Sequence, residues 1–207
     1  MTLWLLSLPS PPSPLFEVGP FTFHYYGLFL ALGIALGILL TARELLLRGY
    51  KATLALDALV FVVPLGFIGA RLYHVVTDYE LYANDPFPGV FEVWNGGLGI
   101  YGAVIGGFLG GLLFARIRDI DPLVLADACA PGLVLAQAVG RWGNYFNQEL
   151  FGRPLNLPWA IEIAPENRPV GFKDATSFHP TFFYEFVLEP AGVPDPPLGC
   201  RALCLKS

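Results

Sequence analysis

The sequence predicts an all-α, polytopic integral membrane protein, because its composition is apolar and its apolar residues form four long runs. Hydrophobic residues make up 55% of the 207 residues and charged residues only 14%, whereas soluble domains contain about 25% charged residues. This composition excludes a disordered chain and argues against a soluble enzyme, whose surface needs more polar residues. The net charge of −5 also excludes a nucleic-acid-binding protein that relies on a basic patch.

Four stretches have the roughly 20 predominantly apolar residues that a helix needs to cross a bilayer. We expect these spans at about residues 21–42, 54–76, 96–115 and 122–146. Each is expected to be helical, because a segment in lipid must satisfy its own backbone hydrogen bonds.

The basic residues of the short loops predict that the N-terminus lies outside. Residues 1–20 and the loop 77–94 contain no Lys or Arg, whereas the other two loops contain five, namely Arg43, Arg48, Lys51, Arg116 and Arg118. The segment after the fourth span, about 147–178, is then external and polar enough to form a small domain. Residues 1–20, which several prolines interrupt, are expected to form a re-entrant or surface-lying external arm.

In this topology the unusual polar residues of the spans lie near the outer face. Charged residues inside a span are rare and usually face a cavity or a partner, although Arg71 can equally snorkel to the headgroups. Four polar residues recur at i, i+3, i+4 and i+7 and therefore share one helix face: Arg141, Asn144, Tyr145 and Gln148. Because arginine can grip a phosphate with two parallel hydrogen bonds, this face predicts a pocket for a phospholipid headgroup.

Small residues and histidines have simpler interpretations. Gly102, Gly106 and Gly110 are spaced by four in the third span, which predicts close packing against another helix. The three histidines lack the spacing of metal ligands.

Five motifs resemble, in order, those of the prolipoprotein diacylglyceryl transferases. The most specific is Gly-Arg-Trp-Gly-Asn-Tyr-Phe-Asn-Gln-Glu at 140–149, closed by Phe151-Gly152. A glycine-rich motif covers 94–102, and shorter motifs lie at 25–28, 69–72 and 179–185. The resemblance covers about residues 15–187.

The resemblance implies a membrane enzyme of lipoprotein biosynthesis. Such an enzyme transfers the diacylglyceryl group of phosphatidylglycerol to the lipobox cysteine thiol in the signal peptide of a prolipoprotein, forming a thioether and releasing glycerol phosphate. It is implied to lie in the bacterial plasma (inner) membrane, with its active site toward the outer face and without metal or organic cofactor.

The resemblance and this chemistry together indicate the site residues. Arg141 and Asn144 are expected to stabilise the charge that develops on the departing phosphate. Other expected contacts of phosphatidylglycerol are Tyr26, Arg71, Gly97, Gly102 and His179. Glu149 is a further catalytic candidate, and is expected to anchor Arg141 or a neighbouring helix end.

The proton-transfer step is the least determined part of this prediction. In some family members a histidine of the glycine-rich motif is the proposed base, and the matching residue here is Tyr101. A tyrosine is a poor base near neutral pH unless cations surround it. Tyr101 could therefore take the proton or orient the substrate, or a positive site could ionise the thiol directly.

The chain departs from the family pattern near its end. Family members continue through further spans that add another arginine-containing motif to the site, whereas only about ten apolar-leaning residues follow His179 here. We therefore expect a truncated fifth helix, a membrane-embedded transferase domain at 1–188, and a Pro-rich tail at 189–207 translated in a non-native frame. Such a chain could bind lipid yet lack part of its catalytic site.

Two other functions stay open on the residues alone. A non-catalytic lipid-binding or transport protein would also use an arginine-lined cavity. An alcohol phosphotransferase would normally use clustered aspartates with metal, whereas Asp57, Asp78 and Asp127 are scattered between the two membrane faces.

Overall fold

The computed structural model describes residues 7–82, 89–92 and 96–191, which are mostly helical with little sheet. They form two compact units, one from residues 7–40 and 130–191 and the other from residues 41–129 within the described ranges. We call these unit 1 and unit 2. Residues 94–95 of the glycine-rich motif and the predicted tail from residue 192 onward lie outside the described residues.

Among the described residues, four helices are long and apolar enough to cross a membrane, which confirms the four predicted spans. They are α1 (Tyr25–Leu47), α2 (Leu54–Thr77), α4 (Ile100–Ile117) and α5 (Pro122–Asn147). Helix α1 begins later than predicted because residues 21–24 form a strand. Helix α4 begins later because Gly96 and Gly97 have φ angles of 88° and 81°, which are left-handed rather than helical.

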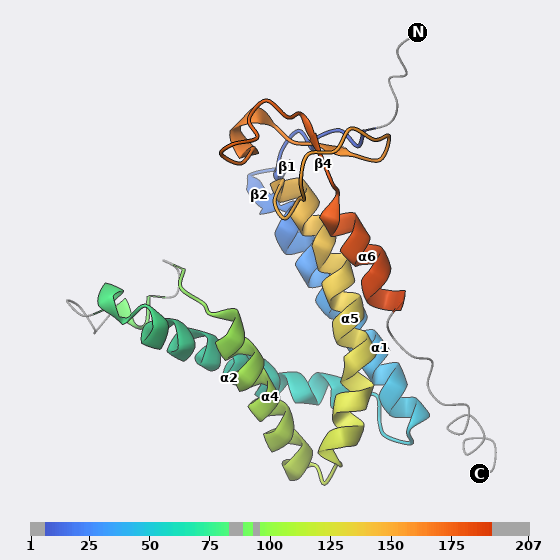
Figure 1. Ribbon diagram of the computed structural model, residues 1–207. Coiled ribbons are helices and arrows are strands. Elements are labelled where there is room, and N and C mark those ends of the chain that lie inside the picture. The colour runs from blue at the N-terminus through green and yellow to red at the C-terminus, as the bar shows by residue number, and fades with distance from the viewer. Residues whose placement is uncertain (1–6, 83–88, 93–95, 192–207) are drawn as a thin grey trace. The chain divides into compact units, whose positions relative to one another are not determined.

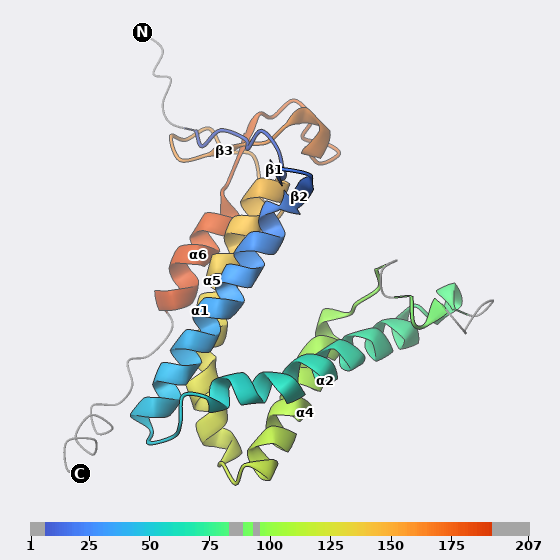
Figure 2. The ribbon, with the colours of Figure 1, turned by 180° about the vertical axis from the view of Figure 1, so that it is seen from behind.

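Unit 2 is built on the antiparallel packing of α2 against α4, which lie side by side in both views (Figures 1 and 2). The three predicted packing glycines of α4 face α2 directly. A Cβ at Gly106 would overlap the carbonyl oxygen of Leu65, and one at Gly110 would lie 2.6 Å from that of Phe61. The glycine spacing therefore creates the close helix contact that it predicted.

Unit 1 joins α1 and α5 through a second set of small residues. A Cβ at Gly33 would lie 2.7 Å from the carbonyl oxygen of Ala136, and one at Gly37 would lie 2.8 Å from that of Gly132. A further helix, α6 (Thr181–Ala191), runs beside them (Figures 1 and 2). Its 11 residues are too few to cross a bilayer.

Short strands, which the sequence did not predict, complete unit 1. Strands β1 (Leu15–Val18) and β2 (Phe21–His24) form a hairpin directly before α1. After α5, strands β3 (Ile161–Glu162) and β4 (Ser177–Phe178) pair around a small core of Ile161, Ile163, Phe178 and Phe182. The part of the chain that the structure describes also contains the 3₁₀ turns η1 (Tyr79–Leu81) in unit 2 and η3 (Pro165–Asn167) in unit 1.

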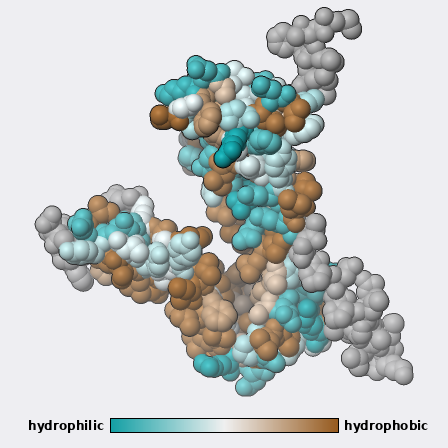
Figure 3. All heavy atoms as spheres, viewed as in Figure 1, coloured by the Kyte–Doolittle hydropathy of each residue, from teal (hydrophilic) through white to brown (hydrophobic). Residues whose placement is uncertain are grey.

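The N-terminal arm is tied to the segment that follows α5. The Leu8 amide donates to the carbonyl oxygen of Ala160 at 2.8 Å, and the Glu162 amide donates to that of Leu8 at 2.9 Å. Hydrophilic residues gather over the segment between α5 and α6, whereas hydrophobic residues cover much of the visible surface of the long helices (Figure 3). This contrast fits a polar cap on membrane helices.

Candidate functional site

Arg141 lies on α5 and forms ion pairs with α6. Its Nε lies 2.8 Å from Glu185 Oε2, and its Nη2 lies 3.3 Å from Glu189 Oε1. The carboxylates come from successive turns of one helix, so both can reach a single guanidinium. Among the described residues no hydrogen bond to Arg141 Nη1 occurs, and 30% of the side chain is exposed. The guanidinium therefore keeps donors for another anion.

Asn144, one turn further along α5, is buried and bound to Glu149. Its Nδ2 donates to Glu149 Oε1 at 2.8 Å, and the same oxygen accepts from Asn147 Nδ2 at 3.2 Å. The Glu149 carboxylate therefore binds the end of α5, the helix that directly precedes it. The residues that pair with Arg141 are instead Glu185 and Glu189.

The end of α5 reverses the chain at Gln148. The Glu149 amide donates to the Asn144 carbonyl and the Gln148 amide to that of Tyr145, at 3.1 and 3.0 Å. This pattern requires a left-handed residue, and Gln148 supplies it with a φ of 52° where glycine is usual.

The remaining polar residues of the α5 face bind neighbouring segments of unit 1. Tyr145 donates from its hydroxyl to the Pro9 carbonyl at 2.8 Å. Gln148 donates to the Pro11 carbonyl at 3.4 Å and accepts from the Ala164 amide at 2.7 Å. Part of the polar face predicted to line a pocket therefore fastens the N-terminal arm and the segment after α5 to the helix.

Tyr26 and His179 are brought to opposite ends of the Arg141 motif. A Cβ at Gly143 would lie 2.6 Å from Tyr26 Cδ2, and one at Gly152 would lie 2.8 Å from His179 Cβ. The His179 ring also lies 3.2 Å, Nδ1 to hydroxyl, from Tyr184. Unit 1 thus assembles five of the predicted site residues: Tyr26, Arg141, Asn144, Glu149 and His179.

Arg71, in unit 2, is buried and bound to the loop before α4. It donates hydrogen bonds of 2.7–2.9 Å to backbone carbonyl oxygens, those of Gly89, Val90, Gly96 and Gly97. Its guanidinium carbon also lies 5.3 Å from the centroid of the Tyr82 ring. With 7% of the residue exposed, Arg71 organises the glycine-rich loop.

Tyr101 and Gly102 open α4 on the side of α2. The Tyr101 ring is 5.8 Å from that of Tyr73, and 67% of the residue is exposed. Gly102 is buried, and a Cβ there would overlap the Gly69 carbonyl oxygen and the Tyr73 side chain. Gly102 thus faces α2, and unit 2 holds the other four predicted site residues: Arg71, Gly97, Tyr101 and Gly102.

Comparison with known proteins matches residues 13–193 to the prolipoprotein diacylglyceryl transferase family. The chain belongs to this family. It is 45% identical over 190 residues to the phosphatidylglycerol–prolipoprotein diacylglyceryl transferase of Paenarthrobacter aurescens, covering 86% of this chain and 59% of the relative. For the enzyme of that name from Cutibacterium acnes the identity is 44% over 192 residues, covering 90% and 64%. The chain spans 48–64% of the length of such curated relatives.

Membership of the diacylglyceryl transferase family accounts for the motifs. The sequence did not predict one polar pair, His74 and Asp78. His74, near the end of α2, places Nδ1 2.9 Å from Asp78 Oδ2. The two residues are four positions apart at a helix end, which is the only sequence signal for the pair. Among the described residues, no group of three or more His, Cys, Asp and Glu side chains could hold a metal ion.

Proposed function

We propose that the chain transfers the diacylglyceryl group of phosphatidylglycerol to the lipobox cysteine of a prolipoprotein. The observation that carries this proposal is the family match over residues 13–193, which includes all five motifs and every candidate site residue. The relatives that it matches are named for this reaction.

The proposed reaction is a substitution at carbon. The cysteine sulfur attacks the diacylglyceryl carbon that carries the phosphate, a C–S bond forms, and the C–O bond to phosphate breaks. Negative charge then grows on the departing glycerol phosphate. A fixed cation aimed at this charge stabilises the transition state.

Arg141 is the proposed phosphate-binding residue. The available Nη1 donors can hydrogen-bond to phosphate oxygens, while Glu185 and Glu189 hold the other side of the guanidinium. Asn144 is the proposed second donor, and Glu149 is proposed to position it, since they are hydrogen-bonded at 2.8 Å. Tyr26 and His179 are proposed to contact phosphatidylglycerol at the two ends of this motif.

Four residues of unit 2 are also proposed to contact or position the substrates. Arg71 fixes the loop whose Gly97 backbone we assign to the headgroup. Gly102 keeps α4 close to α2 at the same end of the helices. Tyr101, exposed at the start of α4, is proposed to orient substrate.

We place the chain in the bacterial plasma membrane with its N-terminus outside. Five basic residues in the two loops assigned to the cytoplasm, against none in the outer loop and N-terminal segment, support this orientation. The active site then faces outward, residues 1–188 form the membrane domain, α6 is a short fifth element, and residues 147–178 are external.

The test is a transfer assay on the purified chain in detergent. Phosphatidylglycerol and a lipobox peptide are mixed in the presence of EDTA, and the mass of the peptide is followed. We expect a mass increase equal to one diacylglyceryl group, and none with phosphatidic acid, which lacks the glycerol headgroup. Saturable lipid binding without product would instead support the non-catalytic lipid-binding alternative.

A further inference from the structure

We propose that His74, oriented by Asp78, is the base that takes the proton of the lipobox cysteine thiol. This inference deepens the proposed function and rests on it. A free cysteine has a pKa of about 8.5, so near neutral pH its thiol is mostly protonated and needs a base or positive surroundings to react.

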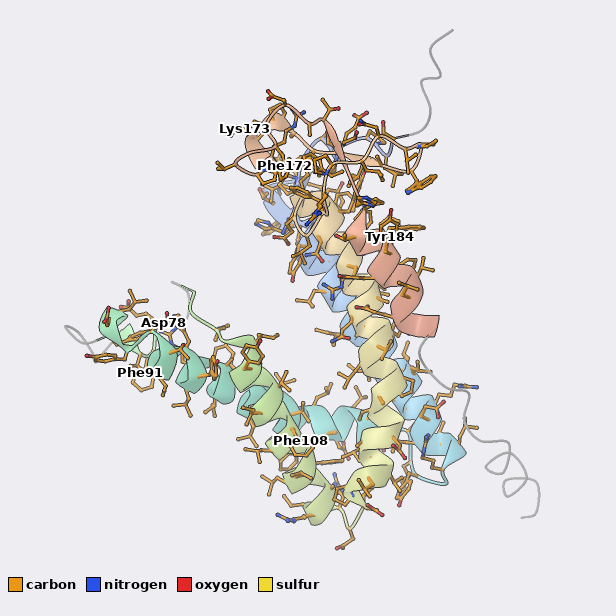
Figure 4. The ribbon with its side chains drawn as sticks, viewed as in Figure 1. Asp78, Phe91, Phe108, Phe172, Lys173 and Tyr184 are labelled. Atoms are coloured by element: carbon orange, nitrogen blue, oxygen red, sulfur yellow. The ribbon has the colours of Figure 1, made fainter. Side chains whose placement is uncertain are left out.

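The pair has the geometry that fixes the tautomer of a histidine base. Asp78 Oδ2 lies 2.9 Å from His74 Nδ1 and also accepts from Thr77 Oγ1 at 2.8 Å. The Asp78 amide donates to the His74 carbonyl at 2.9 Å, so the aspartate is fixed by its backbone as well. Because a carboxylate can only accept, Nδ1 carries the proton and Nε2 holds the lone pair. Figure 4 shows Asp78 at the end of α2.

His74 also lines a pocket that contains the positively charged side chain of Arg71. The pocket has a volume of about 310 Å³ and is lined by residues that include Arg71, Tyr82, Glu92, Gly96 and Gly97. A Cβ at Gly97 would overlap Nε2 of His74 and lie 2.7 Å from Nη1 of Arg71. The lone-pair side of the ring therefore lies against the glycine-rich loop, beside the Arg71 guanidinium.

The charges around the ring favour the proposed step. The ionisable groups nearest the ring are Arg71 on α2, Asp78 directly after α2, Tyr82 after η1, and Glu92 on the loop. Tyr101 of α4 lies beside Tyr73, the residue that precedes His74. Arg71 stabilises a thiolate that forms beside it, and Asp78 stabilises the imidazolium. The thiol proton moves to Nε2, the sulfur forms the C–S bond as the C–O bond to phosphate breaks, and the imidazolium then releases its proton to water.

The decisive variants are His74→Gln and Asp78→Asn, with His24→Gln as the matched control. His24 is an exposed histidine of strand β2 and is not one of the predicted site residues. Transfer should fall by about 10²-fold or more in His74→Gln, the usual contribution of a general base, and by a smaller factor in Asp78→Asn. His24→Gln should transfer at the wild-type rate.

The dependence of the rate on pH distinguishes a lost base from a damaged fold. Without its base, His74→Gln depends on the thiolate already in solution, so its rate should rise about tenfold per pH unit up to about pH 8.5. A misfolded variant would gain nothing from higher pH. Equal rates and equal pH dependence in His74→Gln and wild type would overturn the assignment and leave the proposed function intact.

A second measurement does not require transfer. Iodoacetamide alkylates thiolates, so alkylation of the lipobox peptide in phosphatidylglycerol–detergent micelles reports ionisation of the thiol. The wild-type chain and His24→Gln should accelerate alkylation, and His74→Gln should not. Acceleration without transfer would support the base and contradict the proposed function, whereas no acceleration by the wild-type chain would overturn the base.

Discussion

At the residue scale, Arg71 and Arg141 show two uses of a charged side chain in a membrane span. The Arg71 guanidinium donates hydrogen bonds to backbone carbonyl oxygens of one loop and lies over the Tyr82 ring. Arg141 is balanced by two carboxylates and keeps donors available. In both cases a buried or half-buried charge has partners, as the low dielectric of a membrane protein requires.

Arg71→Lys should loosen the glycine-rich loop. Lysine keeps the charge but lacks the planar fork that reaches several carbonyl oxygens at once. We expect amide hydrogen exchange in residues 89–92 and 96–99 to rise at least about tenfold, since one lost hydrogen bond to a charged group costs about 1.5–3 kcal/mol.

The matched control for Arg71→Lys is Arg48→Lys. Arg48 binds Glu44 through Nη1 alone, at 2.7 Å to the carboxylate and 3.0 Å to the carbonyl, which an ammonium can imitate. Unchanged exchange in the loop of Arg71→Lys would contradict the assigned role.

The sequence identified both arginines as unusual but could not supply their partners. Both arginines are unusual because of their depth in the predicted spans, which follows from the length of the apolar runs and the charge of the loops. The partners of Arg71 lie 18–26 positions away in a loop, and Glu189 lies 48 positions from Arg141. Contacts over such separations depend on tertiary packing, which periodicity does not encode.

At the element scale, the contact of α2 with α4 should depend on individual glycines. Gly106→Ala places a methyl group onto the Leu65 carbonyl oxygen, whereas Gly111→Ala meets nothing within 4 Å. We expect Gly106→Ala to lower the free energy of unfolding by about 1–3 kcal/mol, the usual cost of overpacking. Gly111→Ala should be neutral or slightly stabilising, because alanine favours helix. Denaturant titration followed by circular dichroism measures both, and equal effects would contradict this packing.

The end of α5 should depend on the Gln148 side chain. Gln148→Ala removes the acceptor of the Ala164 amide and the donor to Pro11. We expect a loss of about 1 kcal/mol in the free energy of unfolding, because the partly buried Ala164 amide loses its acceptor. Gln137→Ala, at an exposed position of the same helix, is the control. A loss no larger than that of Gln137→Ala would show that the side chain does not hold these segments.

The long helices could be predicted from the sequence, whereas the short strands could not. The four spans were predicted because length and apolarity alone define them. The β1–β2 hairpin and the two-residue strands β3 and β4 were not, because strands this short carry no measurable alternation. The later start of α4 follows from left-handed glycines at 96 and 97, whose apolar neighbours made them resemble part of a span.

At the scale of the whole molecule, the orientation in the membrane is the first property to test. In a chain whose own cysteines are replaced by serine, Glu80→Cys and Lys51→Cys introduce single thiols into opposite loops. A membrane-impermeant maleimide applied to intact cells should label Glu80→Cys only, because the proposed topology places the basic loop in the cytoplasm. Labelling of Lys51→Cys alone would invert the proposed topology and place the Arg141 motif on the cytoplasmic side.

The proposed function assigns diacylglyceryl transfer to this chain and the contact with the phosphate to Arg141. The most direct measurement is the rate of thioether formation on a lipobox peptide, by mass spectrometry, for wild type, Arg141→Ala, Arg141→Lys and the control Arg43→Ala. Arg43 is largely exposed, with 62% of its side chain accessible. We predict transfer by wild type and Arg43→Ala, a loss of about 10²–10³-fold in Arg141→Ala, and incomplete recovery in Arg141→Lys. Absence of product from the wild-type chain, or equal rates with and without the Arg141 guanidinium, would contradict the account.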